Sequence, residues 1–158
     1  MLNPQTLRRN RHWLNPGRAM RRRKFLRGFC ALAAVLGVYP VGVLSFTWSH
    51  VSRSDFQGGR NGPLDAYRHA LASATVAHTL GEWAVRGVTT LSESQGRDSN
   101  RMDIHNNRIG AKIGARAGAF REIEPAVRQA VLNGRVHASD LDQITWLPKD
   151  QWRDGRLW

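Results

Sequence analysis

Residues 28–48 read GFCALAAVLGVYPVGVLSFTW and contain no charged side chain. A helix rises about 1.5 Å per residue, so this stretch is long enough to cross a hydrocarbon layer of about 30 Å. Pro40 is compatible with this interpretation, because membrane helices tolerate proline better than soluble helices do. The segment therefore predicts a transmembrane helix or the hydrophobic region of a signal sequence. A buried helix of a soluble core is the disfavoured alternative.

The residues before this segment are strongly basic. Residues 1–27 hold nine of the 24 Lys and Arg and no acidic residue, whereas the other 15 nearly balance the 12 Asp and Glu. A basic flank remains on the cytoplasmic side of a membrane and can attract anionic lipid. We therefore expect a bacterial inner-membrane protein with a cytoplasmic N-terminus and a periplasmic or extracytoplasmic C-terminal domain. Binding of nucleic acid to this tail is the less favoured hypothesis.

The export route and the fate of the segment stay open at this stage. Residues 22–27, RRKFLR, resemble a twin-arginine export signal, but basic flanks also precede ordinary signal segments. No Ala-x-Ala cleavage motif stands at the end of the apolar segment, which favours an uncleaved anchor. Met20 is a plausible alternative start. Cys30 is the only cysteine, so no disulfide within the chain is possible.

Four regions follow from these patterns: a tail at 1–27, an apolar segment at 28–48, a linker at 49–62 and an exported domain at 63–158. Apolar residues at helical spacing predict helices over 64–86, with a break at Gly81, over 102–120, and over 125–133. Residues 144–148 predict a short extended piece. The expected fold class is thus all-α: one N-terminal helix and a small helical bundle with an extended C-terminal segment.

Glycines recur every four residues at Gly110, Gly114 and Gly118. Such a row gives one smooth helix face at the expense of helix stability. We expect another helix of the same domain to pack closely against it. The alternative is that the groove along these glycines binds a partner protein. The Trp-rich C-terminus, with Trp146, Trp152 and Trp158, is a second surface that could bind one.

Two short stretches concentrate ionisable side chains. Asp65 and His69 are four residues apart and therefore share one helix face, while Asp103 and His105 lie at the start of the second helix, with Glu93 in the loop before it. All five are candidate ligands of a divalent metal such as Zn²⁺ or Mn²⁺, since helical Asp, Glu and His sites recur in bundles. A bound metal could supply hydroxide for hydrolysis, with His69, Glu93, Asp103 and His105 as catalytic candidates.

Two alternatives use the same residues without a metal. An Asp–His pair could act as a general base while Asn106 and Asn107 orient a substrate. The same side chains could instead form a buried polar network that only holds the helices together.

The runs GPLDAYRHA at 62–70 and MDIHNNRIG at 102–110 resemble an uncharacterised bacterial domain family. Its members carry a GPxDAxRHA…HE…MDxHNNxxG pattern and include envelope, secreted and toxin-like proteins. The resemblance covers about residues 61–114 and implies a shared helical fold and polar site, without a reaction. This chain departs from the pattern at 92–93, where Ser92 replaces the histidine and Glu93 is retained.

Three functional hypotheses remain. The first is a membrane-anchored hydrolase, metal-dependent, that acts on envelope lipid or cell-wall material. The second is a non-catalytic, membrane-tethered interaction module. The third, a toxin domain directed at nucleic acid, conflicts with the apolar segment that follows the basic tail.

Overall fold

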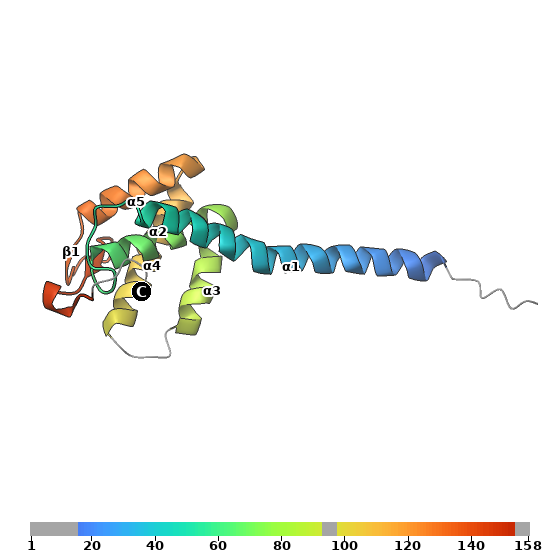
Figure 1. Cartoon of the computed structure of the whole chain (residues 1–158), viewed down its shortest axis with the longest axis horizontal. Coiled ribbons are helices and arrows are strands. Elements are labelled where there is room, and N and C mark those ends of the chain that lie inside the picture. Colours follow the sequence, from blue (N-terminus) through green and yellow to red (C-terminus); the bar gives the residue numbers. More distant parts are fainter. Residues whose placement is uncertain (1–15, 93–97, 154–158) are drawn as a thin grey trace, which may run out of the picture. The chain divides into compact units, whose positions relative to one another are not determined.

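The computed structural model describes residues 16–92 and 98–153, and most of them are helical (Figure 1). The chain forms two compact units, one up to Pro40 and one from Val41 onward. The first contains most of helix α1, and the second contains the end of α1 and the domain with the candidate site. This arrangement confirms a mostly helical fold that begins with one long apolar helix.

Helix α1 spans Pro16–Val51, so it is longer than the expected apolar segment on both sides. Within it, Arg23–Val51 is long and apolar enough to cross a membrane, and it lies near the N-terminus, where a signal segment would have the same composition. Its large apolar side chains are exposed over the first unit: Phe25, Leu26, Phe29, Leu32, Leu36 and Val38. An exposed apolar surface of this kind suits lipid better than water. The tail at 1–15 lies outside the described residues.

The end of α1 is part of the domain. Val43, Thr47 and Val51 are buried, and their four-residue spacing places them on one helix face. Val51 belongs to the main hydrophobic core. The expected linker at 49–62 therefore differs from the observed structure, because its first residues continue α1 and Ser54 is also buried. Burial of apolar side chains of α1 against the domain stabilises the last turn of the helix, so the helix continues beyond Trp48.

The remaining helices agree broadly with the sequence prediction. Helix α2 covers Pro63–Leu80 and α3 covers Glu82–Ser92, and the two are separated at Gly81 as expected. Gly81 has φ 94°, a conformation that glycine adopts at little cost. Helix α4, Asp98–Arg116, begins and ends four residues earlier than expected, and a short 3₁₀ helix, η1, follows at Phe120–Glu122. Helix α5 covers Ile123–Leu132.

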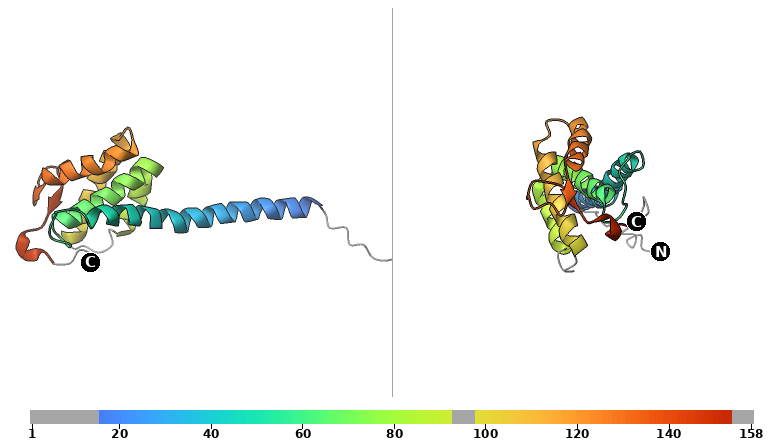
Figure 2. Two further views of the ribbon diagram at one scale, coloured as in Figure 1. Left: turned by 45° about the horizontal axis from the view of Figure 1, so that its top comes forward. Right: turned by 90° about the vertical axis from the view of Figure 1, so that its left-hand side faces the viewer.

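Helix α2 is the central element of the domain. It lies among α4, α5 and the end of α1, as the views in Figure 2 show. Its apolar face packs against side chains from α5 and from the C-terminal segment to form the core: Leu64, Tyr67, Leu71 and Ala74 with Ile123, Val127, Val131 and Ile144. The hydroxyl of Tyr67 donates a hydrogen bond of 2.6 Å to Oε1 of Glu124 and links α2 to α5. Core packing and this hydrogen bond together fix the position of α2.

Helices α2 and α4 pack with their backbones in close approach. A Cβ atom on Gly110 would lie 2.2 Å from the carbonyl oxygen of Ala70, far inside van der Waals contact. Ser73 adds a hydrogen bond of 2.8 Å from its Oγ to Oδ1 of Asn107. The expected packing of a neighbouring helix on the glycine row is therefore correct for Gly110 and Gly114. Because α2 already covers these two glycines, they offer no groove for a partner.

The C-terminal segment packs against both α2 and α4. Strands β1 (Arg135–Val136) and β2 (Thr145–Trp146) pair in parallel, and a 3₁₀ helix, η2, follows at Lys149–Gln151. Strand β2 matches the expected extended piece. The ring of Trp146 packs against the core, and Trp152 donates its indole N–H to the carbonyl oxygen of Leu147. These two tryptophans thus cover the domain itself, and Trp158 lies outside the described residues.

Candidate functional site

The first turns of α2 deliver two ionisable side chains to one place. The backbone N–H of Asn61 donates a hydrogen bond of 2.6 Å to Oδ2 of Asp65, which fixes the carboxylate at the helix start. Oδ1 of the same carboxylate pairs with the guanidinium of Arg68. His69 follows one turn after Asp65, and its Nε2 lies 3.4 Å from that Oδ1. Asp65 is thus a buried, fully partnered carboxylate.

Helix α4 brings the third side chain. Its residues Asp103, Asn107, Gly110 and Gly114 share one face, and the glycines let this face approach α2 closely. Asp103 consequently reaches His69, with 3.5 Å between its Oδ1 and the same Nε2 atom. Oδ1 of Asp103 is buried and accepts no hydrogen bond among the described residues.

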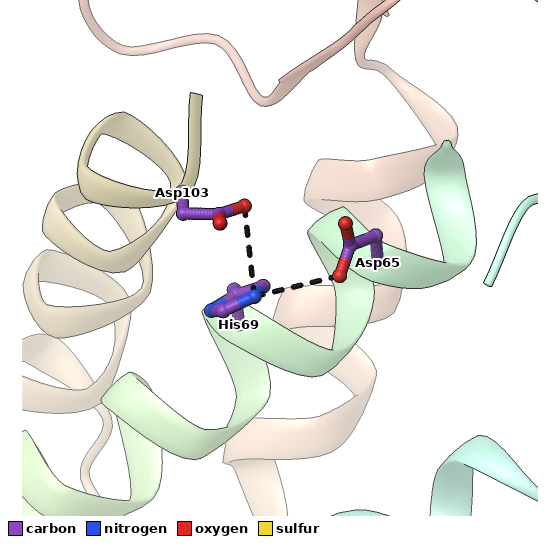
Figure 3. Close-up of side chains that lie close together, drawn as sticks. All are labelled: Asp65, His69 and Asp103. Carbon is purple, nitrogen blue, oxygen red and sulfur yellow. Dashed lines mark ion pairs between the residues drawn. The ribbon is translucent and has the colours of Figure 1, made fainter. Parts of the chain in front are cut away.

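The imidazole of His69 therefore lies between two carboxylates that come from two helices (Figure 3). One ligand atom from each of Asp65, His69 and Asp103 lies within 4.8 Å of the other two. In the part of the chain that the structure describes, these three are the His, Cys, Asp or Glu residues that lie close enough together to share one metal ion. We call it the Asp–His–Asp cluster.

The three groups influence one another's ionisation. Burial would raise the pKa of Asp65, but His69, Arg68 and the Asn61 N–H together lower it below its usual value. Burial would lower the pKa of His69, and the two carboxylates outweigh this effect and raise it. Burial raises the pKa of Asp103 to about 6, although the neighbouring His69 acts in the opposite direction. The cluster thus contains a carboxyl group with a pKa of about 6 and a histidine whose pKa is raised, and shifted pKa values are a common property of functional sites.

A pocket of about 280 Å³ opens beside the cluster. Its remaining walls are polar and come from the loop before α2, from α2 itself and from the first turn of α4: Arg60, Asn61, Arg68, Ser99 and Asn100. The side chains of His69 and Asp103 are about one-third exposed and line this pocket.

One predicted site residue of the described part of the chain, His105, is not part of the cluster. His105 lies two residues after Asp103, and residues at this spacing point to different sides of a helix. Its ring nitrogen Nε2 lies 2.8 Å from the carbonyl oxygen of Gln143, next to the C-terminal segment. His105 is therefore outside the Asp–His–Asp cluster, and its role as a metal ligand stays a prediction. Glu93 lies outside the described residues.

Asn106 has a structural role, whereas the sequence analysis considered it as a residue that orients a substrate. Its buried amide donates to the carbonyl oxygen of Thr145 at 2.8 Å and accepts from the Thr145 N–H at 3.0 Å. It therefore ties α4 to β2, rather than orienting a substrate or joining two helices. The contribution of Arg60 to the pocket was also missed, because nothing in the sequence distinguishes it from other exposed arginines.

The geometry of the cluster fits a small divalent cation. Zn²⁺ binds nitrogen and oxygen ligands at about 2.0–2.2 Å, so adjacent ligands of a tetrahedral site lie about 3.4 Å apart. The distances from His69 Nε2 to the two carboxylate oxygens, 3.4 and 3.5 Å, match this spacing. The buried and unpartnered Oδ1 of Asp103 also fits, since a cation would complete its coordination. Oxygen-rich sets of this type accept Mn²⁺ as well as Zn²⁺.

The fold and the cluster define a small helical domain with a His-and-carboxylate site and an apolar helix before it. The chain belongs to the family described as Domain of unknown function (DUF6973), whose model matches residues 30–135. The match includes most of the apolar helix and all three residues of the Asp–His–Asp cluster, and it confirms membership of an uncharacterised domain family. Neither the curated proteins nor the solved structures contain a match to the chain.

Proposed function

We propose that this protein is a membrane-anchored hydrolase of the bacterial envelope whose Asp–His–Asp cluster binds one divalent cation, Mn²⁺ or Zn²⁺. The observation that carries the proposal is the position of His69 Nε2, 3.4 and 3.5 Å from carboxylate oxygens of two different helices, at the wall of an open pocket. A bound cation would lower the pKa of a water molecule and provide a nucleophile at neutral pH.

The three residues of the Asp–His–Asp cluster would have different roles as ligands of the cation. Asp103 and His69 are half-buried and face the pocket, so they would hold the cation where a substrate can approach it. Asp65 is held by Arg68 and the Asn61 N–H, so it would be the rigid ligand that fixes the other two. Envelope lipid and cell-wall material are the expected substrates, because α1 would keep the pocket at the membrane.

Metal analysis of the full chain in a nonionic detergent tests the proposal. After treatment with EDTA, the protein is dialysed against Mn²⁺ or Zn²⁺ and the bound metal is measured by mass spectrometry. We expect about one ion per chain, lost in His69→Asn and Asp103→Asn. His105→Asn is the matched control, since His105 lies on the same helix as Asp103 and contacts Gln143 instead.

Circular dichroism of each variant separates loss of metal from loss of fold. Metal binding that persists in a folded His69→Asn variant would overturn the cation site. Hydrolysis is then measured with chromogenic carboxylic and phosphoric esters, and wild-type protein that binds metal but cleaves none of them would remove the hydrolase proposal for these classes.

One observation favours a second candidate, a hydrolase without a metal. The oxygen of Asp65 that faces His69 is also paired with Arg68, which competes with a cation for that oxygen. In this case Asp65 orients His69, and His69 acts as a general base. Activity that survives EDTA and disappears in His69→Asn would favour this candidate over the first.

Membrane topology is the other part of the proposal. The basic tail and the apolar helix support a cytoplasmic N-terminus and an exported domain. Alkaline phosphatase fused after residue 158 should be active, because this enzyme functions only outside the cytoplasm. A second fusion carries green fluorescent protein at the C-terminus. If this fusion is fluorescent and the phosphatase fusion is inactive, the proposed topology is contradicted.

A further inference from the structure

The wall of the pocket beside the Asp–His–Asp cluster carries two arginines that would not bind the cation in the proposed hydrolysis. Arg68 extends from α2 next to His69, and Arg60 extends from the loop before α2. Both line the same pocket as His69 and Asp103. Two guanidinium groups at one pocket are a frequent arrangement for binding an oxyanion.

The Arg68 side chain is held in position by three contacts. One nitrogen pairs with Asp65, the other donates a hydrogen bond of 3.3 Å to the carbonyl oxygen of Gly59, and the guanidinium lies 5.6 Å from the centre of the Trp48 ring. A guanidinium that is already ordered loses little conformational entropy when a ligand binds. Arg68 is therefore a preorganised positive group at the edge of the pocket.

Arg60 has a fixed backbone and an available side chain. Its backbone pairs with Arg153 in both directions, with N–O distances of 3.4 and 3.2 Å. The side chain is exposed, and among the described residues no carboxylate pairs with its guanidinium. Its charge nevertheless acts on Asp103 across the pocket. An arginine at the pocket wall that has no ion pair among residues 16–92 and 98–153 is suited to bind a ligand rather than to stabilise the fold.

The first turn of α4 completes the wall. Ser99 and Asn100 line the pocket close to the helix N-terminus, where the backbone carries a partial positive charge. This end of the helix adds to the attraction that the two guanidinium groups exert on an anion.

We propose that this pocket binds a phosphoester group, with Arg60 and Arg68 on its non-bridging oxygens. The proposal deepens the proposed function and rests on it for the bound cation. The positive charges of this cation and of the two guanidinium groups exceed the negative charges of Asp65 and Asp103, so the pocket has an excess of positive charge. A doubly charged phosphate compensates that excess better than a singly charged carboxylate does. A lipid headgroup and free phosphate share the phosphate oxygens that the two arginines would bind, and the experiment distinguishes these sources.

Isothermal titration calorimetry on the full chain in nonionic detergent tests the proposal. The ligands are inorganic phosphate, glycerol 3-phosphate as a soluble phosphomonoester headgroup, and acetate as a carboxylate control, each added to Mn²⁺-loaded and to EDTA-treated protein. We expect phosphate or the headgroup to bind and acetate to bind much more weakly. Tighter binding of the headgroup identifies lipid as the source, and tighter binding of inorganic phosphate identifies the free ion.

Arg60→Gln is the decisive variant, because Arg60 has no ion pair among the described residues whose loss would disturb the cluster. Its phosphate affinity should fall roughly tenfold or more, as expected for loss of a charge-assisted hydrogen bond. Arg108→Gln is the matched control, since it removes one exposed positive charge from α4 outside the pocket. Its phosphate affinity should remain that of the wild type.

Equal affinities of wild type and Arg60→Gln would overturn the proposal, and so would acetate binding as tight as phosphate binding. The two proposals have separate measurements and can fail separately. A chain that binds Mn²⁺ but no phosphate retains the cation site and loses the phosphoester site. A chain that binds phosphate through Arg60 without any metal retains the phosphoester site and loses the cation.

Discussion

The carbonyl oxygen of Ala74 on α2 lies so close to Gly114 on α4 that a Cβ atom on this glycine would come within 2.0 Å of it. Gly110 and Ala70 make the same kind of contact one turn earlier. These close approaches fix the distance between the two helices. Because His69 and Asp103 extend from the same helix pair, the glycines also determine the geometry of the Asp–His–Asp cluster.

Gly114→Ala should therefore destabilise the protein by about 2 kcal/mol or more, since a methyl group inserted at a tight contact forces backbones apart. We also expect weaker metal binding, because the helices that carry His69 and Asp103 must separate. Thermal or urea unfolding measures the first effect, and metal dialysis measures the second.

Gly118→Ala is the control within the same glycine row. A Cβ atom there would lie 3.4 Å from Oε2 of Glu122, the end of a flexible side chain, so its stability should stay near that of the wild type. Equal destabilisation by both substitutions would contradict the close-packing explanation.

Tyr67→Phe tests the link between α2 and α5. The substitution removes the hydroxyl that donates to Glu124 and should lower the free energy of unfolding by about 1 kcal/mol, the typical net value of such a bond. Urea unfolding provides the measurement. Glu124→Gln keeps an acceptor for the hydroxyl and should cost less, whereas no loss in Tyr67→Phe would show that the hydrogen bond adds nothing to stability.

Asp103→Asn should stabilise the metal-free protein at neutral pH. The folded-state pKa of Asp103 is raised from 3.8 to about 6, so the folded state binds more protons than the unfolded state between these values. Stability consequently falls as the pH rises from about 4 to about 6 and stays lower above it. The shift corresponds to roughly 1–3 kcal/mol, and this is the gain expected from the Asp103→Asn substitution at neutral pH.

Unfolding of the EDTA-treated wild type and Asp103→Asn is compared at about pH 4 and about pH 7.5, on either side of the titration. The difference should disappear at the lower pH, where both side chains are neutral in the folded state. A variant that is less stable than the wild type at the higher pH would show that the ionised carboxylate stabilises the metal-free fold.

Asn106→Ala should be among the most destabilising substitutions in α4. It leaves the half-buried N–H and carbonyl of Thr145 without these partners, and each polar group left unsatisfied away from water costs about 1–3 kcal/mol. Thermal unfolding compares it with Arg108→Gln, an exposed change on the same helix that should have little effect. Similar melting temperatures for the two variants would exclude a structural role for the Asn106 amide.

Several features were predictable from the sequence because they depend on local spacing. The uncharged run of residues predicts the apolar helix, and Gly81 predicts the break between α2 and α3. Strand β1 was not predictable, since two exposed residues carry no periodic signal. The burial of Val43, Thr47 and Val51 was also not predictable, because an apolar face against a domain and one against lipid have the same composition.

The sequence by itself determined that Asp65 and His69 share a helix face, since four residues make nearly one helical turn. Only the tertiary structure decided that Asp103 meets them and that His105 does not. That outcome depends on which face of α4 is turned toward α2, and Gly110 and Gly114 decide it because only their face admits the backbone of Ala70 and Ala74. The placement of Arg60 at the same pocket likewise follows from the folded loop before α2, which no local pattern encodes.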